Sequence, residues 1–83
     1  MQVYPNPADD EVNVSFILKE KCKVAIKVYD LSANLIEILR KPKRLKPDGY
    51  TFKYDLSSYQ PGMYLIVVET NYGDKTVQRV LRN

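Results

Sequence analysis

Three adjacent carboxylates, Asp9, Asp10 and Glu11, form the one acidic cluster of the sequence. Carboxylate oxygens are ligands that Ca2+ prefers, so this cluster could contribute to a calcium site at the edge of a domain. The alternating D-x-D-x-D spacing of calcium loops is absent, however. A solvated loop is therefore the simpler interpretation, and we expect neither a metal ion nor a cofactor.

The residues of the common catalytic sites are missing. The sequence contains no His, so neither a Ser-His-Asp nor a Cys-His arrangement can be built. Its three glycines, Gly49, Gly62 and Gly73, fall at expected turns and not in a phosphate-binding loop. The single cysteine, Cys22, excludes an intrachain disulfide and is better explained as a small structural residue than as a reactive thiol. We therefore expect no enzyme activity.

Basic and aromatic residues suggest binding as an alternative to catalysis. The net charge is +3, and much of the excess lies between Arg40 and Pro47, a segment expected to be an exposed loop. Lys53 stands between Phe52 and Tyr54, as in a stacking platform for single-stranded nucleic acid. Strand alternation instead places Tyr50, Phe52 and Tyr54 together on one face, which favours packing in a core. Nucleic-acid binding, which would weaken steeply with salt, is permitted but not favoured.

The elements that would position these residues are short strands. Apolar and polar residues alternate over most of the sequence, and the alternation stops where turn residues cluster, which is typical of antiparallel strands. Strands are expected near residues 12–18, 24–28, 35–39, 50–54, 63–70 and 75–81, with a short edge strand at Val3 and Tyr4. The spacing, with no convincing helix, indicates a sandwich or barrel around one core.

Two turns have recognisable chemistry. Gln60 to Met63 suits a type II turn, in which Pro61 sets φ and Gly62 accepts a positive φ. It would launch the most hydrophobic run, which ends at Thr70 and is expected at the centre of a sheet with both faces largely covered. Asp30 to Asn34 suits a hairpin turn.

The length of 83 residues leaves room for one domain, residues 1–83. A chain of this size buries only about 60 to 65 per cent of its unfolded surface, so marginal stability is expected. No stretch approaches the roughly 20 apolar residues of a membrane helix, and the first residues lack the pattern of a signal peptide. The domain is therefore either cytoplasmic or excised from a longer exported precursor.

The order of its motifs makes the sequence resemble a known family. Val3 to Ala8 contains Tyr-Pro-Asn-Pro, Val28 to Ser32 precedes a hairpin, Asp55 to Tyr64 contains Pro-Gly-Met-Tyr, and Arg79 to Arg82 lies in the last hairpin. In this order, and over nearly the whole length, the motifs resemble the type A C-terminal sorting domain of the type IX secretion system of Bacteroidetes.

The resemblance implies an all-β, immunoglobulin-like antiparallel sandwich of about seven short strands at the end of a secreted cargo protein. The outer-membrane translocon and shuttle proteins of the type IX system would recognise the folded domain in the periplasm. A sortase-like peptidase would then remove the domain and couple the cargo to a lipopolysaccharide at the cell surface. The domain would be a ligand and a substrate, with no nucleic-acid partner and no membrane insertion.

The resemblance also assigns candidate residues. The family's opening motif, which marks the end of the linker, and its G-x-Y element fall on Pro5, Asn6, Pro7, Gly62 and Tyr64. These residues have simple structural explanations as stiff or turn-forming residues. The candidate translocon contacts lie in the last hairpin, where the family's export signal is concentrated: Lys75, Val77, Arg79 and Arg82. An exposed edge hairpin with unpaired backbone groups can dock by strand addition.

Two features depart from the family pattern. Ala33 and Asn34 stand where many members have Gly followed by Lys, so the left-handed position is expected to move to Asn34. The segment after Arg40 is also more charged than the family leads us to expect. An alternative function is an accessory adhesion or carbohydrate-binding sandwich of a surface protein, which glycan binding by the isolated domain would favour.

Overall fold

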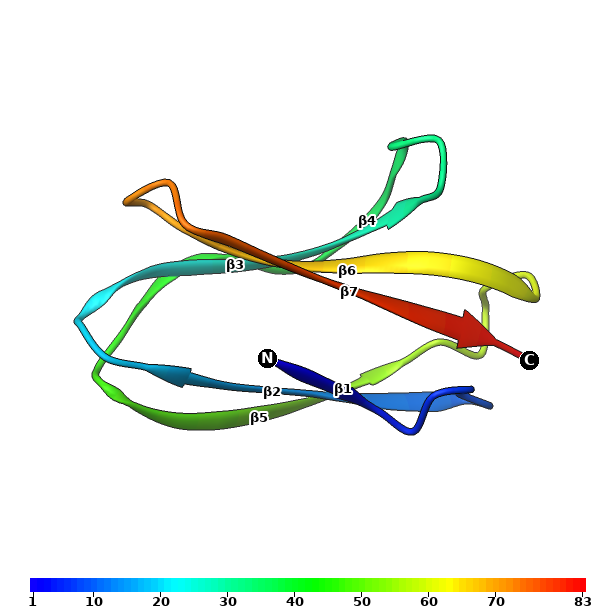
Figure 1. Cartoon of the computed structure of the whole chain (residues 1–83), viewed down its shortest axis with the longest axis horizontal. Coiled ribbons are helices and arrows are strands. Elements are labelled where there is room, and N and C mark those ends of the chain that lie inside the picture. The colour runs from blue at the N-terminus through cyan, green and yellow to red at the C-terminus, as the bar shows by residue number, and fades with distance from the viewer.

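Two antiparallel sheets face each other in the computed structural model, which describes all residues from Met1 to Asn83 (Figure 1). The strands are β1 (Gln2–Tyr4), β2 (Glu11–Leu18), β3 (Cys22–Asp30), β4 (Leu35–Leu45), β5 (Asp48–Asp55), β6 (Gly62–Thr70) and β7 (Lys75–Arg82). One sheet has the order β1-β2-β5 and the other β4-β3-β6-β7. The predicted all-β sandwich of seven strands is confirmed.

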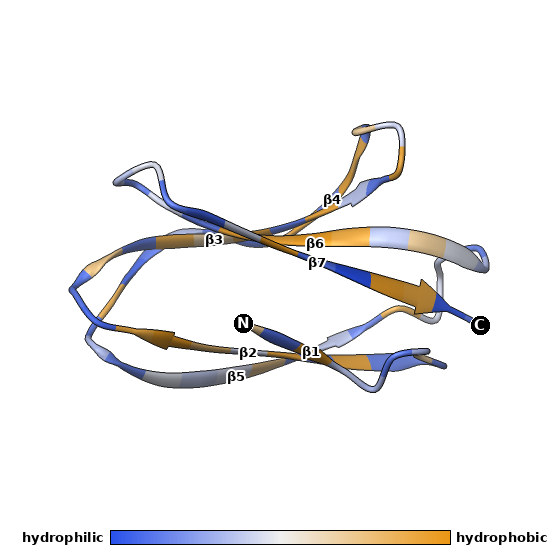
Figure 2. Cartoon of the chain, viewed as in Figure 1, coloured by the Kyte–Doolittle hydropathy of each residue, from blue (hydrophilic) through white to orange (hydrophobic).

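The core fills the space between the sheets because alternate residues of each strand point inward. On β2 these are Val12, Val14 and Phe16, as predicted, and on β6 they are Ile66 and Val68. Thirteen buried residues form one cluster, and no charged or polar residue is buried with them. Figure 2 shows the apolar residues concentrated on β2, β3 and β6.

The predicted central position of the most hydrophobic run is confirmed. β6 lies between β3 and β7, and Val67 on its outer face is only 6% exposed. The expected type II turn before it differs in the structure. Gly62 does adopt a positive φ, of 152°, but the hydrogen-bonded turn is earlier, where Tyr59 N–H donates to Leu56 O. The buried Leu56 side chain fixes the turn at that earlier position.

The basic segment after Leu39 is largely a strand, so its prediction as a loop was wrong. β4 continues to Leu45 and pairs with β3, with Arg40 opposite Ile26 and Lys43 opposite Val24. An extra residue lies between these pairs, and Pro42 sits in the resulting bulge. Proline is tolerated there because a bulge on an edge strand needs no ladder hydrogen bond.

Arg40 on this edge strand lies over the ring of Phe52, with 5.0 Å between its guanidinium carbon and the ring centroid. The aromatic residues of β5, Tyr50, Phe52 and Tyr54, are half-buried and pack against the core. Their predicted core packing is confirmed, and they offer no open stacking platform. A charge turned inward on an edge strand also disfavours pairing with other chains.

The hairpin between β3 and β4 is held by Asp30. Its carboxylate accepts hydrogen bonds from the backbone N–H groups of Ser32 and Asn34, each at 2.9 Å, and from the Asn34 side chain at 3.0 Å. Ala33, and not Asn34 as expected, adopts the left-handed conformation, with φ of 65°. Asn34 is engaged by Asp30, so the positive φ falls on the preceding residue.

Replacing Ala33 with glycine should stabilise the domain, because glycine removes the steric cost of a left-handed Cβ. We expect Ala33→Gly to raise the free energy of unfolding by about 1 kcal/mol, measured by urea denaturation. Asn34→Gly is the matched control and should destabilise, since Asn34 contributes hydrogen bonds and needs no positive φ. A stabilisation by the control and not by Ala33→Gly would contradict this placement.

Acid should weaken the same hairpin. The backbone N–H of Asn34, then its side chain, lowers the pKa of Asp30. Because the folded pKa lies below the unfolded one, this stabilisation is complete above the unfolded pKa, at about pH 4, and is lost as pH falls through the folded pKa. We expect the urea midpoint to fall as pH drops below about 4, and to fall less in Asp30→Asn. Equal slopes in both proteins would exclude a contribution from Asp30.

Candidate recognition site at the terminal hairpin

Asn6 joins the N-terminal segment to the last strand. Its side-chain Nδ2 donates to Arg79 O at 3.1 Å, and Leu81 N–H donates to its Oδ1 at 3.0 Å. The side-chain amide therefore occupies the place of a peptide group of a neighbouring strand. Pro5 and Pro7 flank it, each preceded by a cis peptide bond. The sequence predicted only that these prolines stiffen the chain.

The contact with β7 continues through Ala8. Its N–H donates to Leu81 O at 2.7 Å, and Asn83 N–H donates to Ala8 O at 2.9 Å. Ala8 is fully buried. Figure 1 shows the segment after β1 at the same end of the sandwich as the C-terminus. We call residues Pro5 to Ala8 the N-terminal latch, because they cover the second half of the outer edge of β7.

The first half of that edge is uncovered. Backbone groups of alternate β7 residues face away from β6, as the bonds of Arg79 and Leu81 to the latch show. By the same alternation, the N–H and C=O groups of Lys75 and Val77 face outward. β7 pairs with no strand other than β6, and no hydrogen bond links these groups to another part of the chain. We call Lys75 to Gln78 the open edge.

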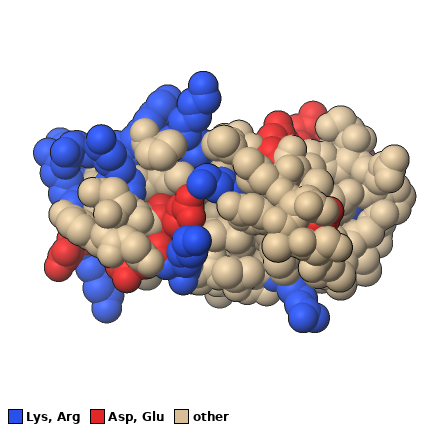
Figure 3. All heavy atoms as spheres, turned by 90° about the horizontal axis from the view of Figure 1, so that it is seen from above, with Lys and Arg blue, Asp and Glu red and all other residues tan.

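The side chains of Lys75, Val77 and Arg79 share the outer face of the four-stranded sheet, because Val80 and the other even-numbered residues of β7 point inward. All three are exposed, and Val77 is 55% exposed. Figure 3, which views this face, shows Lys and Arg gathered at one end and mainly uncharged surface at the other. The sequence-predicted contacts thus present a basic, apolar, basic series.

Glu69 modulates the charge at the open edge. It lies opposite Lys75 across the β6–β7 pair, with 3.7 Å between the Lys75 Nζ and its Oε2, and it also forms an ion pair with Lys27. The hydrogen bond from Lys27 is the main cause that lowers the pKa of Glu69. One carboxylate therefore serves two lysines, so Glu69 does not neutralise Lys75 alone.

Arg82 differs from the other three candidate contacts. Its side chain is only 13% exposed, and its Nε donates to Leu56 O at 3.0 Å. One terminal nitrogen lies 3.5 Å from Ser57 O and 3.9 Å from a carboxylate oxygen of Asp10. These contacts tie the β5–β6 connection to the last strand. Arg82 therefore has a structural role within the domain.

Gly62 and Tyr64 support the same end of the sandwich. The Tyr64 hydroxyl donates to Gln60 O at 2.6 Å, and its ring lies 5.2 Å from that of Tyr59. The Tyr59 hydroxyl in turn contacts Glu37. Burial, and then the hydrogen bond to Glu37, raises the pKa of Tyr59. The G-x-Y element thus shapes the β5–β6 connection and presents no reactive group.

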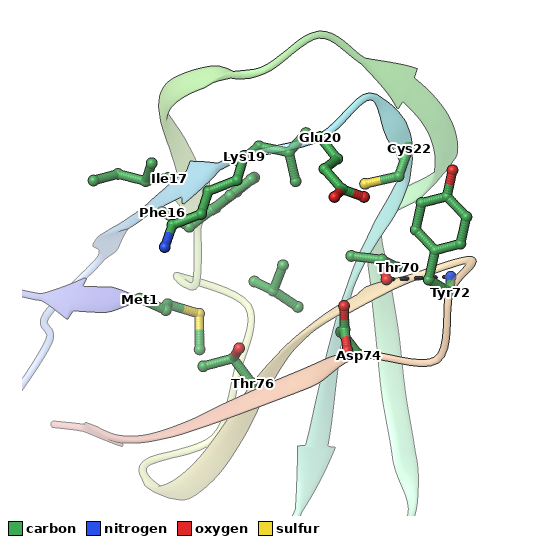
Figure 4. A pocket seen from close by; sticks show the side chains of 12 residues that line it. Met1, Phe16, Ile17, Lys19, Glu20, Cys22, Thr70, Tyr72, Asp74 and Thr76 are labelled. Atoms are coloured by element: carbon green, nitrogen blue, oxygen red, sulfur yellow. Dashed lines mark hydrogen bonds between the residues drawn. The ribbon is translucent and has the colours of Figure 1, made fainter.

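A hollow with a volume of about 410 Å3 lies at the opposite end of the sandwich (Figure 4). Phe16, Cys22 and Val68 are among the apolar residues that line it, and the carboxylates of Glu20 and Asp74 lie at its rim. No group of three His, Cys, Asp or Glu is placed to hold a metal ion anywhere in the chain. The hollow therefore assembles no recognisable catalytic or metal chemistry.

Comparison with known proteins gives a family match. A family described as "Secretion system C-terminal sorting domain" matches residues 2–83. No curated protein matches the chain. The match covers the sandwich from β1 to the last residue, including the latch and the open edge. The structure has no long apolar helix of the kind that crosses a membrane.

Removing the Asn6 side chain should loosen the latch. We expect Asn6→Ala to lower the free energy of unfolding by about 1 to 3 kcal/mol, because it removes two hydrogen bonds that each contribute about 0.5 to 1.5 kcal/mol. Asn13→Ala is a matched control, since the Asn13 side chain makes only one long bond, at 3.3 Å to Tyr4 O. Chemical denaturation of both variants measures the difference, and equal losses would show that the latch contributes no special stability.

Proposed function

The chain belongs to the family of C-terminal sorting domains of the type IX secretion system, and we propose that it directs an attached cargo protein through that system to the cell surface. The family is one of non-catalytic signal domains. We propose that residues 1–83 are a single sorting domain carried by a longer secreted precursor. Its partners are then the outer-membrane translocon, the shuttle proteins and the sortase-like peptidase.

The observation that carries this proposal is the open edge beside exposed Lys75, Val77 and Arg79. These residues lie in the terminal hairpin, where the family's export signal is concentrated. Their side chains are exposed and lie outside the core, whereas the Arg82 side chain binds other residues of the same chain. We therefore assign recognition in the periplasm to the first three residues and an anchoring role to Arg82.

The N-terminal latch supports a proposal that the folded form of the domain is recognised. The opening motif, at the end of the linker, and the terminal hairpin lie about seventy residues apart in sequence but share hydrogen bonds. A partner that recognises the hairpin therefore recognises a surface that exists only after folding. Cargo attached ahead of Met1 would join the domain beside the hollow that Met1 lines, and not at the C-terminal end of the sandwich.

A charge reversal at the hairpin tests the proposal. A reporter fused to residues 1–83 should reach the surface of a host that has the type IX system, and the deletion of Lys75 to Asn83 should retain it. The deletion also removes core residue Val80, so the sharper variant is Lys75→Glu with Arg79→Glu. We expect it to lower the surface reporter by about tenfold, through lost electrostatic complementarity.

The matched control reverses two exposed lysines of β4, Lys41→Glu with Lys43→Glu, and makes the same change in net charge. It should export normally. Circular dichroism of the purified domains checks that both variants remain folded. Equal export by the hairpin variant and the unchanged domain would contradict recognition through the terminal hairpin.

A further inference from the structure

Open sheet edges attract further strands, and three of the four edges of this sandwich are protected or lack an apolar contact surface. β4 carries three irregularities in its pairing, Pro42 in a bulge and the inward Arg40. β1 has only three residues. β5 exposes no large apolar side chain. β7 is regular and pairs with β6 without a register shift, yet only its second half is covered.

The open edge therefore has a defined length. Asn6 occupies Arg79 O and Leu81 N–H, so an added strand can pair with Lys75 and Val77 and must stop at Arg79. Val77 is the apolar residue at the centre of this short stretch. It lies opposite Val67 of β6, and the two side chains are neighbours on the outer face of the sheet. Backbone pairing and an apolar contact are thus offered at the same place.

The charges on either side of Val77 determine which side chains an added strand can place there. Lys75 and Arg79 lie two residues to either side of Val77 on the same face. A second copy of this chain, paired antiparallel about Val77, would place Lys75 opposite Arg79 twice, and like charges in opposite positions destabilise a sheet. Acidic residues at these two positions would instead complement both cations.

We propose that the open edge binds an extended strand of a partner protein whose outer-face residues follow the order acidic, apolar, acidic, in the pattern Glu-x-Val-x-Glu. The apolar residue lies beside Val77, and the two carboxylates lie beside Lys75 and Arg79. The latch fixes where this strand ends. This inference rests on the proposed function for its partner, a component of the secretion machinery, and adds the mode and the chemistry of binding.

Peptide titration tests the chemistry directly. A synthetic Glu-x-Val-x-Glu peptide, added to the isotopically labelled 83-residue chain, should shift the amide signals of Lys75, Val77 and Arg79 and slow amide exchange at Val77. A Lys-x-Val-x-Lys peptide should bind at least about tenfold more weakly because both cross-strand charge pairs become repulsive. Shifts that are absent, or equal for the two peptides, would overturn the proposal.

Substitution of Val77 tests the mode. Val77→Pro removes an N–H that faces away from β6, so it blocks an added strand while leaving the β6 ladder intact. Val77→Thr keeps the N–H and is the matched control. Export of the reporter should be lost in the proline variant and kept in the threonine variant, with slow amide exchange at Thr76 and Gln78 showing that β7 remains paired. If the proline variant does not fold, the peptide titration alone decides.

The outcomes separate this inference from the proposed function. Normal export of a folded Val77→Pro domain, together with failure of the Lys75→Glu, Arg79→Glu domain, would overturn strand addition but leave hairpin recognition standing. Normal export of all hairpin variants would remove both. A dimer in sedimentation that Val77→Pro dissociates would also overturn the inference, because the occupant would then be a second copy.

Discussion

The hydrogen bonds between the Asn6 amide and the backbone of β7 hold the N-terminal segment against the last strand. They pair backbone groups next to the fully buried Val80 that would otherwise be left open at the edge of the sheet. They also seat Ala8 in the core. A domain of this length has a stability of only about 4 to 12 kcal/mol, so a few such bonds are a substantial share of it.

Several polar side chains near the latch form hydrogen bonds with backbone groups of the connections between strands. Arg82 binds carbonyl oxygens of the β5–β6 connection, Tyr64 binds Gln60 O, and Asp55 accepts a bond from Ser57 N–H. Asp30 does the same at the β3–β4 turn. These polar side chains therefore shape turns and connections, which agrees with a family of signal domains.

The two edge strands of the four-stranded sheet, β4 and β7, differ in how readily another strand could pair with them. Both are edge strands of one sheet, but β4 is irregular and carries an inward charge, whereas β7 is regular. The latch protects β7 only beyond Arg79. The result is a short edge with one exposed apolar residue between two cations, whose length is limited by the latch.

Most strands and their side-chain faces could be predicted from the sequence, because a period of two is a local property of an extended chain. The sequence placed Val12, Val14 and Phe16 in the core, and the same alternation could have put Lys75, Val77 and Arg79 on one face and separated Arg82 from them. Tertiary structure alone decided that Arg40 to Leu45 forms a strand, because that segment is ordered by pairing with β3. It also decided the partner of Asn6, since a hydrogen bond across 73 positions leaves no local pattern to read.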